Sequence, residues 1–291
     1  MSDVAIFWAQ ALVLWLAAWG ANQYLASLSP ASPALQRLQG LAIPLIFGAT
    51  LLFLWETVVA GFKVPSVLMP APSAIAAKFA ASLPILQADF AQTVLRAVLP
   101  GWALGCASGF AVALLCDRLP FLQRGLLPLG NFVAALPMIG IAPIMVMWFG
   151  FDWPSKVAVV VVMTFFPMLV NTVAGLEASG ALERDLMASY GAPYGATLVK
   201  LRLPHALPFI FNALKINSTL AMIGAIVAEF FGTPVVGMGF RISTEIGRMG
   251  LDMVWAEIVL AAIAGSGFYG LLALAERAAT FWHPSMRTRP S

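Results

Sequence analysis

The amino-acid sequence predicts an all-α integral membrane protein. Of its 291 residues, 61% are hydrophobic and 10% are charged, and the mean hydropathy is +0.90. Soluble chains carry about 25% charged residues, and a soluble fold cannot hide this much apolar surface from water. The apolar residues also fall into long blocks, and a spanning helix needs about 20 such residues in a row. Together these observations indicate several membrane-spanning helices.

Seven windows of the chain are long and apolar enough to span a membrane. They are residues 4–26, 41–62, 97–116, 126–149, 156–176, 208–230 and 253–275. The first window lacks the positively charged start and the cleavage site of a signal peptide, so we expect a retained helix. The chain then divides into an extra helix with its linker (1–40), a six-helix core (41–284) and a short tail (285–291).

The lysine and arginine residues between the windows indicate the orientation. If the C-terminus and residues 177–208 face the cytoplasm, nine of these residues lie inside and six outside, while Lys215 lies within a span. Because cytoplasmic segments carry the excess of Lys and Arg, we expect the N-terminus outside and the C-terminus in the cytoplasm. Basic residues beside apolar runs also favour membrane lipid as their partner, and no nucleic-acid-binding stripe occurs.

Segment 63–96 is expected to form an external connection. Its prolines favour an extended chain, after which Ser73 caps a short helix with Ile75, Phe79 and Leu83 on one apolar face. In the next window, glycines recur every fourth residue, a pattern that lets another helix approach closely. These glycines are Gly101, Gly105 and Gly109.

Three prolines, Pro128, Pro137 and Pro143, interrupt the window 126–149. Because proline removes a helical hydrogen bond, the freed carbonyl groups must be satisfied inside the protein or beside water. Broken helices of this kind often line a transport path. A kink that serves only packing explains the prolines equally well, so both interpretations stay open.

The window 208–230 is the most polar of the seven. Six of its residues follow a spacing of three and four, so they share one helix face. They are Asn212, Lys215, Thr219, Met222, Ile226 and Glu229. Polar groups at membrane depth normally face the bundle interior or a cavity. For Lys215, snorkelling or pairing with another residue competes with a direct substrate contact. The same alternatives apply to Glu229.

The sequence carries no motif for catalysis. The Walker-type ATP-binding pattern, the GxSxG elbow and the HExxH metal pattern do not occur. Cys106 and Cys116 are ten residues apart in one window, beyond disulfide reach on a helix, and His205 and His283 are isolated. We therefore expect a chain that is not an enzyme and holds no metal or other cofactor. The alternative function is an ion-coupled secondary transporter. The sparse carboxylates within the windows weaken this alternative, because a proton relay needs more ionisable groups within the spans.

Residues 177–208 form the longest polar interval in the second half of the chain. Leu182, Leu186 and Tyr190 lie at i, i+4 and i+8, so they form an apolar stripe on a short helix. Such a stripe suits docking into a groove of a partner, and packing against the protein's own helices is the alternative. The residues Glu-Arg-Asp at 183–185 lie off the stripe and would set the register of docking by charge.

Several landmarks of the sequence belong together. They are Leu54-Trp55-Glu56, residues 68–73 (LMPAPS), residues 93–96 (TVLR), Leu136-Pro137 through Ala142-Pro143, Trp148-Phe149-Gly150, Phe165-Phe166-Pro167, Asn171 and Trp282-His283-Pro284. In this order they resemble the inner-membrane permease subunits of bacterial binding-protein-dependent ABC importers, over about residues 50 to 284. Within that family the chain is most similar to the nitrate, sulfonate and taurine group, which also contains importers of riboflavin and of pyrimidine vitamin precursors.

The interval 177–208 is similar to the cytoplasmic EAA loop of that family. The Glu-Ala-Ala positions read Asp185-Leu186-Met187 here, so only the acidic character is kept. The resemblance implies that this loop forms a coupling helix that docks on a separate ATPase subunit. The residues expected to take part are Leu182, Glu183, Asp185, Leu186, Tyr190, Gly191, Ala192, Leu203 and Pro204.

The resemblance also implies the partners and the task of the chain. A second copy of the permease would form a homodimer, two ATPase subunits would bring ATP and Mg, and a periplasmic binding protein would deliver a small solute. The solute would be a sulfonate, nitrate, taurine, or a riboflavin or pyrimidine vitamin precursor. The expected location is the bacterial inner membrane. The translocation path is assigned to Pro137, Asn171, Asn212, Lys215, Thr219, Met222 and Glu229.

Overall fold

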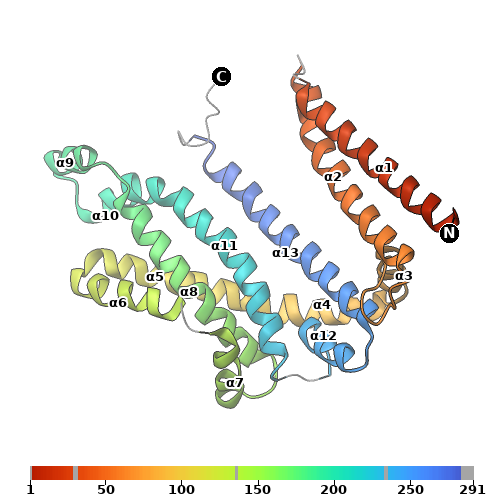
Figure 1. Cartoon of the computed structure of the whole chain (residues 1–291). Helices are drawn as coiled ribbons and strands as arrows, with labels where there is room; N and C mark the ends of the chain where they lie inside the picture. The colour runs from red at the N-terminus through yellow and green to blue at the C-terminus, as the bar shows by residue number, and fades with distance from the viewer. Residues whose placement is uncertain (1, 29–31, 135–136, 233–234, 283–291) are drawn as a thin grey trace. The chain divides into compact units, whose positions relative to one another are not determined.

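A computed structural model describes residues 2–28, 32–134, 137–232 and 235–282. Within these ranges every regular element is a helix and no strand occurs (Figure 1). The chain separates into two compact units, one built from residues 1–83 and 245–256 and the other from residues 84–244 and 257–291. The expected tail, 285–291, lies outside the described residues.

The first unit is organised around a pair of antiparallel helices (Figure 1). Its helices are α1 (Ser2–Ser27), α2 (Pro33–Gly61) and α3 (Pro72–Ala81). The ring of Trp8 lies against Gly61 and contacts the ring of Phe62 in a tilted arrangement, at a centroid distance of 4.9 Å. The amide of Gln39 in α2 donates to the carbonyl groups of Leu25 and Leu28, which end α1. Helix α2 begins at Pro33, so part of the linker expected at Ser27–Gln39 is helical.

Ser73 does not cap α3, which corrects the expectation from the sequence. Ala71 stands at the N-cap without a side-chain hydrogen bond. The Ser73 hydroxyl and backbone N–H instead donate to the Glu56 carboxylate of α2, at 2.7 and 3.0 Å. A carboxylate near a helix N-terminus is favourable because the unpaired N–H groups there attract negative charge. Glu56 thus holds α3 against the end of α2.

The second unit holds the remaining helices. They are α4 (Leu83–Phe90), η1 (Ala91–Val98), α5 (Leu99–Arg118), α6 (Pro120–Ala134), α7 (Met138–Phe149), α8 (Trp153–Glu177), α9 (Ala181–Ser189), α10 (Tyr194–Thr197), η2 (Leu198–Arg202), α11 (Leu203–Glu229), α12 (Met238–Gly247) and α13 (Leu251–Ala279). The first residue of α4, the last residues of α12 and the first residues of α13 are counted with the first unit. Helix α8 packs against both α5 and α11. Helices α9 and α10 lie at one end of α11, and α7 packs near the other end (Figure 1).

The repeated glycines of α5 bring this helix into close contact with α8. A Cβ atom on Gly101 would lie 2.6 Å from the Cβ atom of Val160, and one on Gly109 would lie 2.5 Å from the carbonyl oxygen of Phe165. Gly105 faces Thr164 at a still closer distance. The close helix approach predicted from the glycine spacing is confirmed, because a larger residue at any of these positions would have to displace its neighbour on α8.

Five helical stretches of the described residues are long and apolar enough to cross a membrane. They are Pro33–Gly61, Leu83–Arg118, Trp153–Glu177, Tyr194–Glu229 and Leu251–Ala279. The all-α membrane class is therefore confirmed. The window 126–149 is split between α6 and α7, neither of which reaches 18 residues, and α1 is not among the five. Of the three prolines, Pro137 has an extended backbone and is the N-cap of α7, whereas Pro128 and Pro143 lie inside α6 and α7.

Two of these stretches are longer than the sequence suggested. Leu83–Arg118 and Tyr194–Glu229 are each 36 residues long, and each contains a π-helical segment, η1 or η2. Residues 83–96 of the expected connection 63–96 and residues 194–208 of the expected loop 177–208 therefore belong to these long helices. Pro204 lies within the second stretch, at the start of α11 and directly after the π-helical segment η2.

Candidate functional site

The apolar stripe predicted from the sequence lies on helix α9 and is exposed. Leu182, Leu186 and Tyr190 are 83%, 57% and 80% exposed, and no residue of this helix is buried. Large apolar side chains this exposed on a nine-residue helix are not packing against the protein's own helices. The stripe is therefore available to a partner, which is the first of the two interpretations that the sequence left open.

Gly191 ends α9 with a left-handed backbone, at φ +67°. Its N–H group donates to the carbonyl of Ala188 at 2.9 Å, and the N–H group of Ala192 donates to the carbonyl of Met187 at 3.0 Å. These two bonds form a Schellman motif, which satisfies carbonyl groups that the helix end leaves unpaired. A Cβ atom at Gly191 would meet nothing within 4 Å, so the backbone conformation alone requires glycine here.

The charged residues of α9 divide into two groups. Glu183 accepts a hydrogen bond from the backbone N–H of Gly180 at 3.2 Å and lies 3.4 Å from the Nε2 atom of His205. Arg184 donates to the carbonyl of Ser179 at 2.6 Å. Both side chains thus fasten α9 to its own chain. Asp185 is exposed, and in the described part of the chain its carboxylate has no partner, so it is the charge left for a contact outside the chain.

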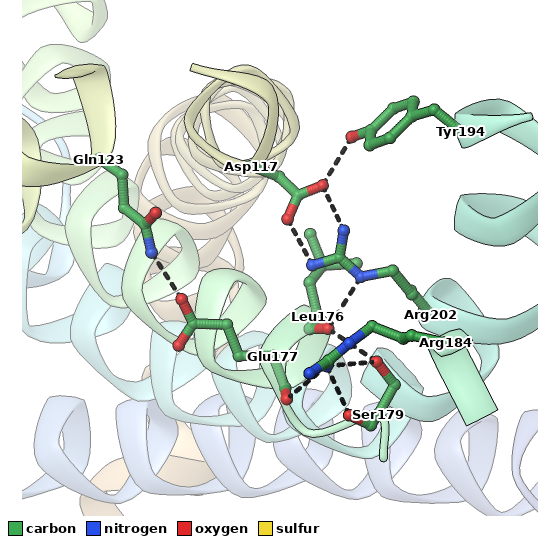
Figure 2. A network of polar contacts seen from close by, with 8 residues as sticks. All are labelled: Asp117, Gln123, Leu176, Glu177, Ser179, Arg184, Tyr194 and Arg202. Carbon is green, nitrogen blue, oxygen red and sulfur yellow. Dashed lines mark hydrogen bonds and ion pairs between the residues drawn. The ribbon is translucent and has the colours of Figure 1, made fainter. Parts of the chain in front are cut away.

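Beneath this loop, the guanidinium of Arg202 joins three helix ends (Figure 2). Its two terminal nitrogens donate to the two carboxylate oxygens of Asp117, at 2.8 and 2.5 Å, and its Nε atom donates to the carbonyl of Leu176 at 3.1 Å. The hydroxyl of Tyr194 also donates to Asp117, at 2.6 Å. We call these four groups the Arg202 junction. It connects the ends of α5 and α8 to the start of the 194–229 helix.

Further contacts surround the Arg202 junction. The guanidinium of Arg118 lies 5.5 Å from the ring centroid of Tyr194, within range of a cation–π interaction. Gln123 of α6 donates to the carboxylate of Glu177, at the end of α8, at 2.6 Å. Four helices therefore meet at this end of the second unit, and polar side chains hold them together.

Two residues expected to take part in coupling lie deeper in the molecule. Leu203 packs against a core cluster that contains Leu176, Ala206 and Ile210. Pro204 is half-buried in the first turn of α11. Neither belongs to the exposed surface formed by α9, so the Leu-Pro pair positions the start of α11 behind the loop.

The residues assigned to the translocation path do not form a single group. The amide of Asn212 donates to the side-chain oxygen of Asn171 at 3.4 Å, and the Asn171 amide donates to the carbonyl of Pro167. Lys215 forms an ion pair with Glu276 of α13 at 2.6 Å, and both side chains are mostly buried. Pairing within the chain is thus the interpretation that the structure favours for Lys215.

Glu229 lies at the other end of α11, buried, and fastens the start of α12. Its carboxylate accepts hydrogen bonds from the Thr93 hydroxyl at 2.8 Å and from the backbone N–H of Gly239 at 2.7 Å. Asp89 and Thr93 accept from the N–H groups of Gly237 and Met238. These contacts assign Glu229 to the structure of the helix end. Pro137 is exposed at the start of α7 and is not part of this group.

Thr219 and Met222 line an open cavity between α11 and α13. Its volume is about 340 Å³, and its wall on α13 includes Ser266 and Tyr269. The other lining residues are the apolar or small Ile223, Ala261, Ala262 and Gly265. All of these residues are described, and none carries a charge. The cavity therefore offers apolar surface and three hydroxyl groups.

Sequence reasoning missed the residues of the Arg202 junction and Glu276. Asp117 directly follows an apolar window, and Arg202 lies directly before the Leu203-Pro204 pair. A charge at the border of a span reads as an ordinary interfacial residue. Asp117 and Arg202 are 85 residues apart, so their pairing leaves no periodic pattern in the sequence. An acidic residue at the end of a helix was the one available hint, because the negative helix terminus disfavours it without a cation nearby.

Comparison with known proteins now identifies the family. Residues 101–287 match the family model of the binding-protein-dependent transport system inner membrane component. The formylaminopyrimidine transport permease protein of Halalkalibacterium halodurans is 32% identical over 76% of this chain and 88% of that protein. The riboflavin transport system permease protein of Chloroflexus aurantiacus is 28% identical over 89% of this chain and 97% of that protein.

A third relative is the putative aliphatic sulfonates transport permease protein of Bacillus subtilis, 25% identical over 85% of this chain and 88% of that protein. The matched family model covers more than half of the chain, and the described helices supply several candidate membrane spans. The chain therefore belongs to the family of inner-membrane permease components of binding-protein-dependent ABC transport systems.

Proposed function

We propose that the chain is the transmembrane subunit of an ATP-driven importer, and that α9 docks on a separate ATPase subunit. The observation that carries this proposal is the exposed stripe of Leu182, Leu186 and Tyr190 on a short helix whose other side chains hold it in place. A stripe at i, i+4 and i+8 fits a groove on a partner. The sequence contains no ATP-binding motif of its own, so the energy has to come from another chain.

The proposal includes the partners and the orientation expected from the sequence. Two copies of the permease pair with two ATPase subunits, which bind ATP and Mg, and a periplasmic binding protein delivers the solute. Helix α9 lies on the cytoplasmic side, where Arg118, Arg124, Arg184 and Lys200 contribute to the excess of positive charge. The exposed carboxylate of Asp185 would meet a basic residue at the edge of the groove on the ATPase.

The test of docking compares two substitutions on opposite faces of α9. Leu186→Asp places a charge in the apolar stripe, and we expect the ATPase subunit to be lost when the permease is purified after co-expression. Ala188→Asp adds the same charge to an exposed position off the stripe, and the ATPase should remain bound. Retention of the ATPase by the Leu186→Asp permease would show that α9 is not the docking helix.

The same preparation separates the importer from the alternative, an ion-coupled secondary transporter. The permease is reconstituted into proteoliposomes with and without the ATPase and the binding protein. We expect solute uptake only with all components and ATP. Uptake by the permease alone, driven by an ion gradient, would contradict the proposal.

For the substrate, we propose an uncharged solute with a ring system. Relatives are named for riboflavin and formylaminopyrimidine, which are neutral, and for sulfonates, which are anions. The cavity between α11 and α13 has hydroxyl groups on Thr219, Ser266 and Tyr269 but no cation, and Lys215, one turn from Thr219, is already paired with Glu276. An anion in such a cavity would lose its hydration without a compensating positive charge.

An uptake assay with the complete importer tests this choice. Cells that express the permease, its ATPase and its binding protein are offered labelled riboflavin, formylaminopyrimidine, taurine and an aliphatic sulfonate. We expect uptake of a neutral compound and no uptake of the zwitterionic taurine or the anionic sulfonate, because both carry a sulfonate group. Uptake of taurine or the sulfonate would contradict the substrate class and leave the importer function standing.

A further inference from the structure

Arg202 is the last residue of η2, the π-helical segment that connects the short helix α10 to α11. A π-helical turn places its residues in a register that differs from the α-helix on either side, and such turns often occur at functional sites. The guanidinium at this position reaches two other helix ends at once, through Asp117 in the last turn of α5 and the carbonyl of Leu176 at the end of α8.

The location of Asp117 is unfavourable for α5 considered by itself. The carbonyl groups at a helix C-terminus carry partial negative charge, which disfavours a carboxylate in the last turn. The positive charge of the Arg202 guanidinium compensates for the Asp117 carboxylate and for the negative end of α8. Two of its nitrogens bind the carboxylate, and the third donates to the carbonyl of Leu176 at the end of α8. The negative ends of α5 and α8 therefore share one positive group.

The ion pair of the Arg202 junction is shielded from water. The side chains of Arg202 and Asp117 are 15% and 8% exposed. A bidentate pair between a guanidinium and a carboxylate is among the strongest and most directional polar contacts in proteins. Removal of one partner leaves the other charge buried and uncompensated, so the contact responds sharply to a change in the position of either helix.

Helix α9 is connected to the Arg202 junction from both sides. At its start, Arg184 donates to the carbonyl groups of Glu177 and Ser179, directly after Leu176 (Figure 2). At its end, the Schellman motif at Gly191 leads within three residues to Tyr194, whose hydroxyl donates to Asp117. The side chains of the apolar stripe take no part in these contacts. These contacts join both ends of α9 to α5 and α8 through the junction.

We propose that Arg202 and Asp117 are positioning residues that couple the movement of α9 to α5, α8 and α11. This inference rests on the proposed function of α9 as the docking helix. If the junction transmits the movement, its loss leaves the ATPase bound and active while less solute moves for each ATP hydrolysed. A residue with only a structural role would lower the amount of assembled importer and leave this ratio unchanged.

The test measures solute transported per ATP hydrolysed, in proteoliposomes that contain the complete importer. Asp117→Asn keeps the shape of the side chain but removes its charge, and Arg202→Lys keeps the charge but removes the planar three-nitrogen contact. We expect both importers to retain the ATPase, and the ratio to fall by about fivefold or more, the usual scale of coupling between sites. Tyr194→Phe removes one hydrogen bond to Asp117 and should lower the ratio less.

Gln123→Ala is the matched control, because Gln123 bonds to Glu177 at the same end of the unit but has no contact with Arg202. Its ratio should equal that of the unmodified importer. Unchanged ratios in Asp117→Asn and Arg202→Lys would overturn the inference, whereas loss of the ATPase from the unmodified permease would overturn the proposed function instead. If Asp117→Asn does not assemble, the milder Arg202→Lys and Tyr194→Phe decide: a lowered ratio supports the inference and a normal ratio in both overturns it.

Discussion

At the scale of single residues, the proposed docking helix α9 depends on backbone geometry as much as on its side chains. Gly191 supplies the left-handed conformation that closes α9, and Glu183 and Arg184 hold the helix while the apolar stripe stays exposed. The glycine of the loop is thus needed for a local reason, the Schellman motif. Its role does not depend on the identity of the partner.

This geometry predicts the effect of Gly191→Ala. A left-handed conformation costs an ordinary residue about 1–2 kcal/mol, so the closed helix end is populated less and binding of the ATPase should weaken by about tenfold. Gly195→Ala is the control, because Gly195 lies in α10 with space for a Cβ atom and no positive φ. Equal ATPase affinities of the two variants, measured by titration in detergent, would contradict the role given to Gly191.

At the scale of elements, the two 36-residue helical stretches, Leu83–Arg118 and Tyr194–Glu229, share one structural feature. Each contains a π-helical segment, and each segment carries a polar residue of a network, Thr93 in η1 with Glu229 and Arg202 in η2 with Asp117. Single π-helical turns inside α-helices often occur at functional sites. The packing of α5 on α8 then depends on close contact at three glycines.

The contact between α5 and α8 predicts that Gly109→Ala destabilises the protein. The added Cβ atom would lie 2.5 Å from the carbonyl oxygen of Phe165, and a backbone atom cannot move aside without shifting α8. Overpacking of this kind costs about 1–3 kcal/mol, which should lower the melting temperature in detergent. Gly125→Ala in α6, where a Cβ atom meets nothing within 4 Å, should leave it unchanged or raise it. Equal melting temperatures would argue against close packing at Gly109.

At the scale of the whole molecule, the polar contacts divide between opposite ends of α11. The Arg202 junction lies at its start, and Glu229, Thr93 and Asp89 hold the beginning of α12 at its end. The cavity lined by Thr219 and Met222 lies between these two ends. In an importer, this order would place the energy input and the outer opening on either side of the solute path.

The expected orientation predicts which residues are accessible from each side of the membrane. A cysteine in place of Ser189 on α9 should react with a membrane-impermeant maleimide only from the cytoplasmic side, and one in place of Gly247 on α12 only from the outside. The native Cys106 and Cys116 are buried, so the labelling of the unmodified protein gives the background signal. Labelling of both positions from the same side would contradict the orientation deduced from the positive residues.

The sequence by itself determined the membrane class, most of the spans, the close approach at the glycines and the apolar stripe on α9, whereas the exposure of that stripe came from the structure. All of these depend on composition or on spacing within one helix, so neighbouring residues carry the information. It misplaced the start of the helix Leu83–Arg118, which lies inside the segment 63–96, and the cap at Ser73, whose side chain bonds to Glu56 instead, because caps depend on partners elsewhere in the chain.

Only the tertiary structure decided the Arg202 junction and the pairing of Lys215 with Glu276. Their partners lie 85 and 61 residues apart in the sequence, and one charged residue at the border of a span resembles any other. A buried charge needs a compensating partner, but local sequence does not say where that partner lies. The fold supplies it by bringing the ends of α5, α8 and η2 to the same place.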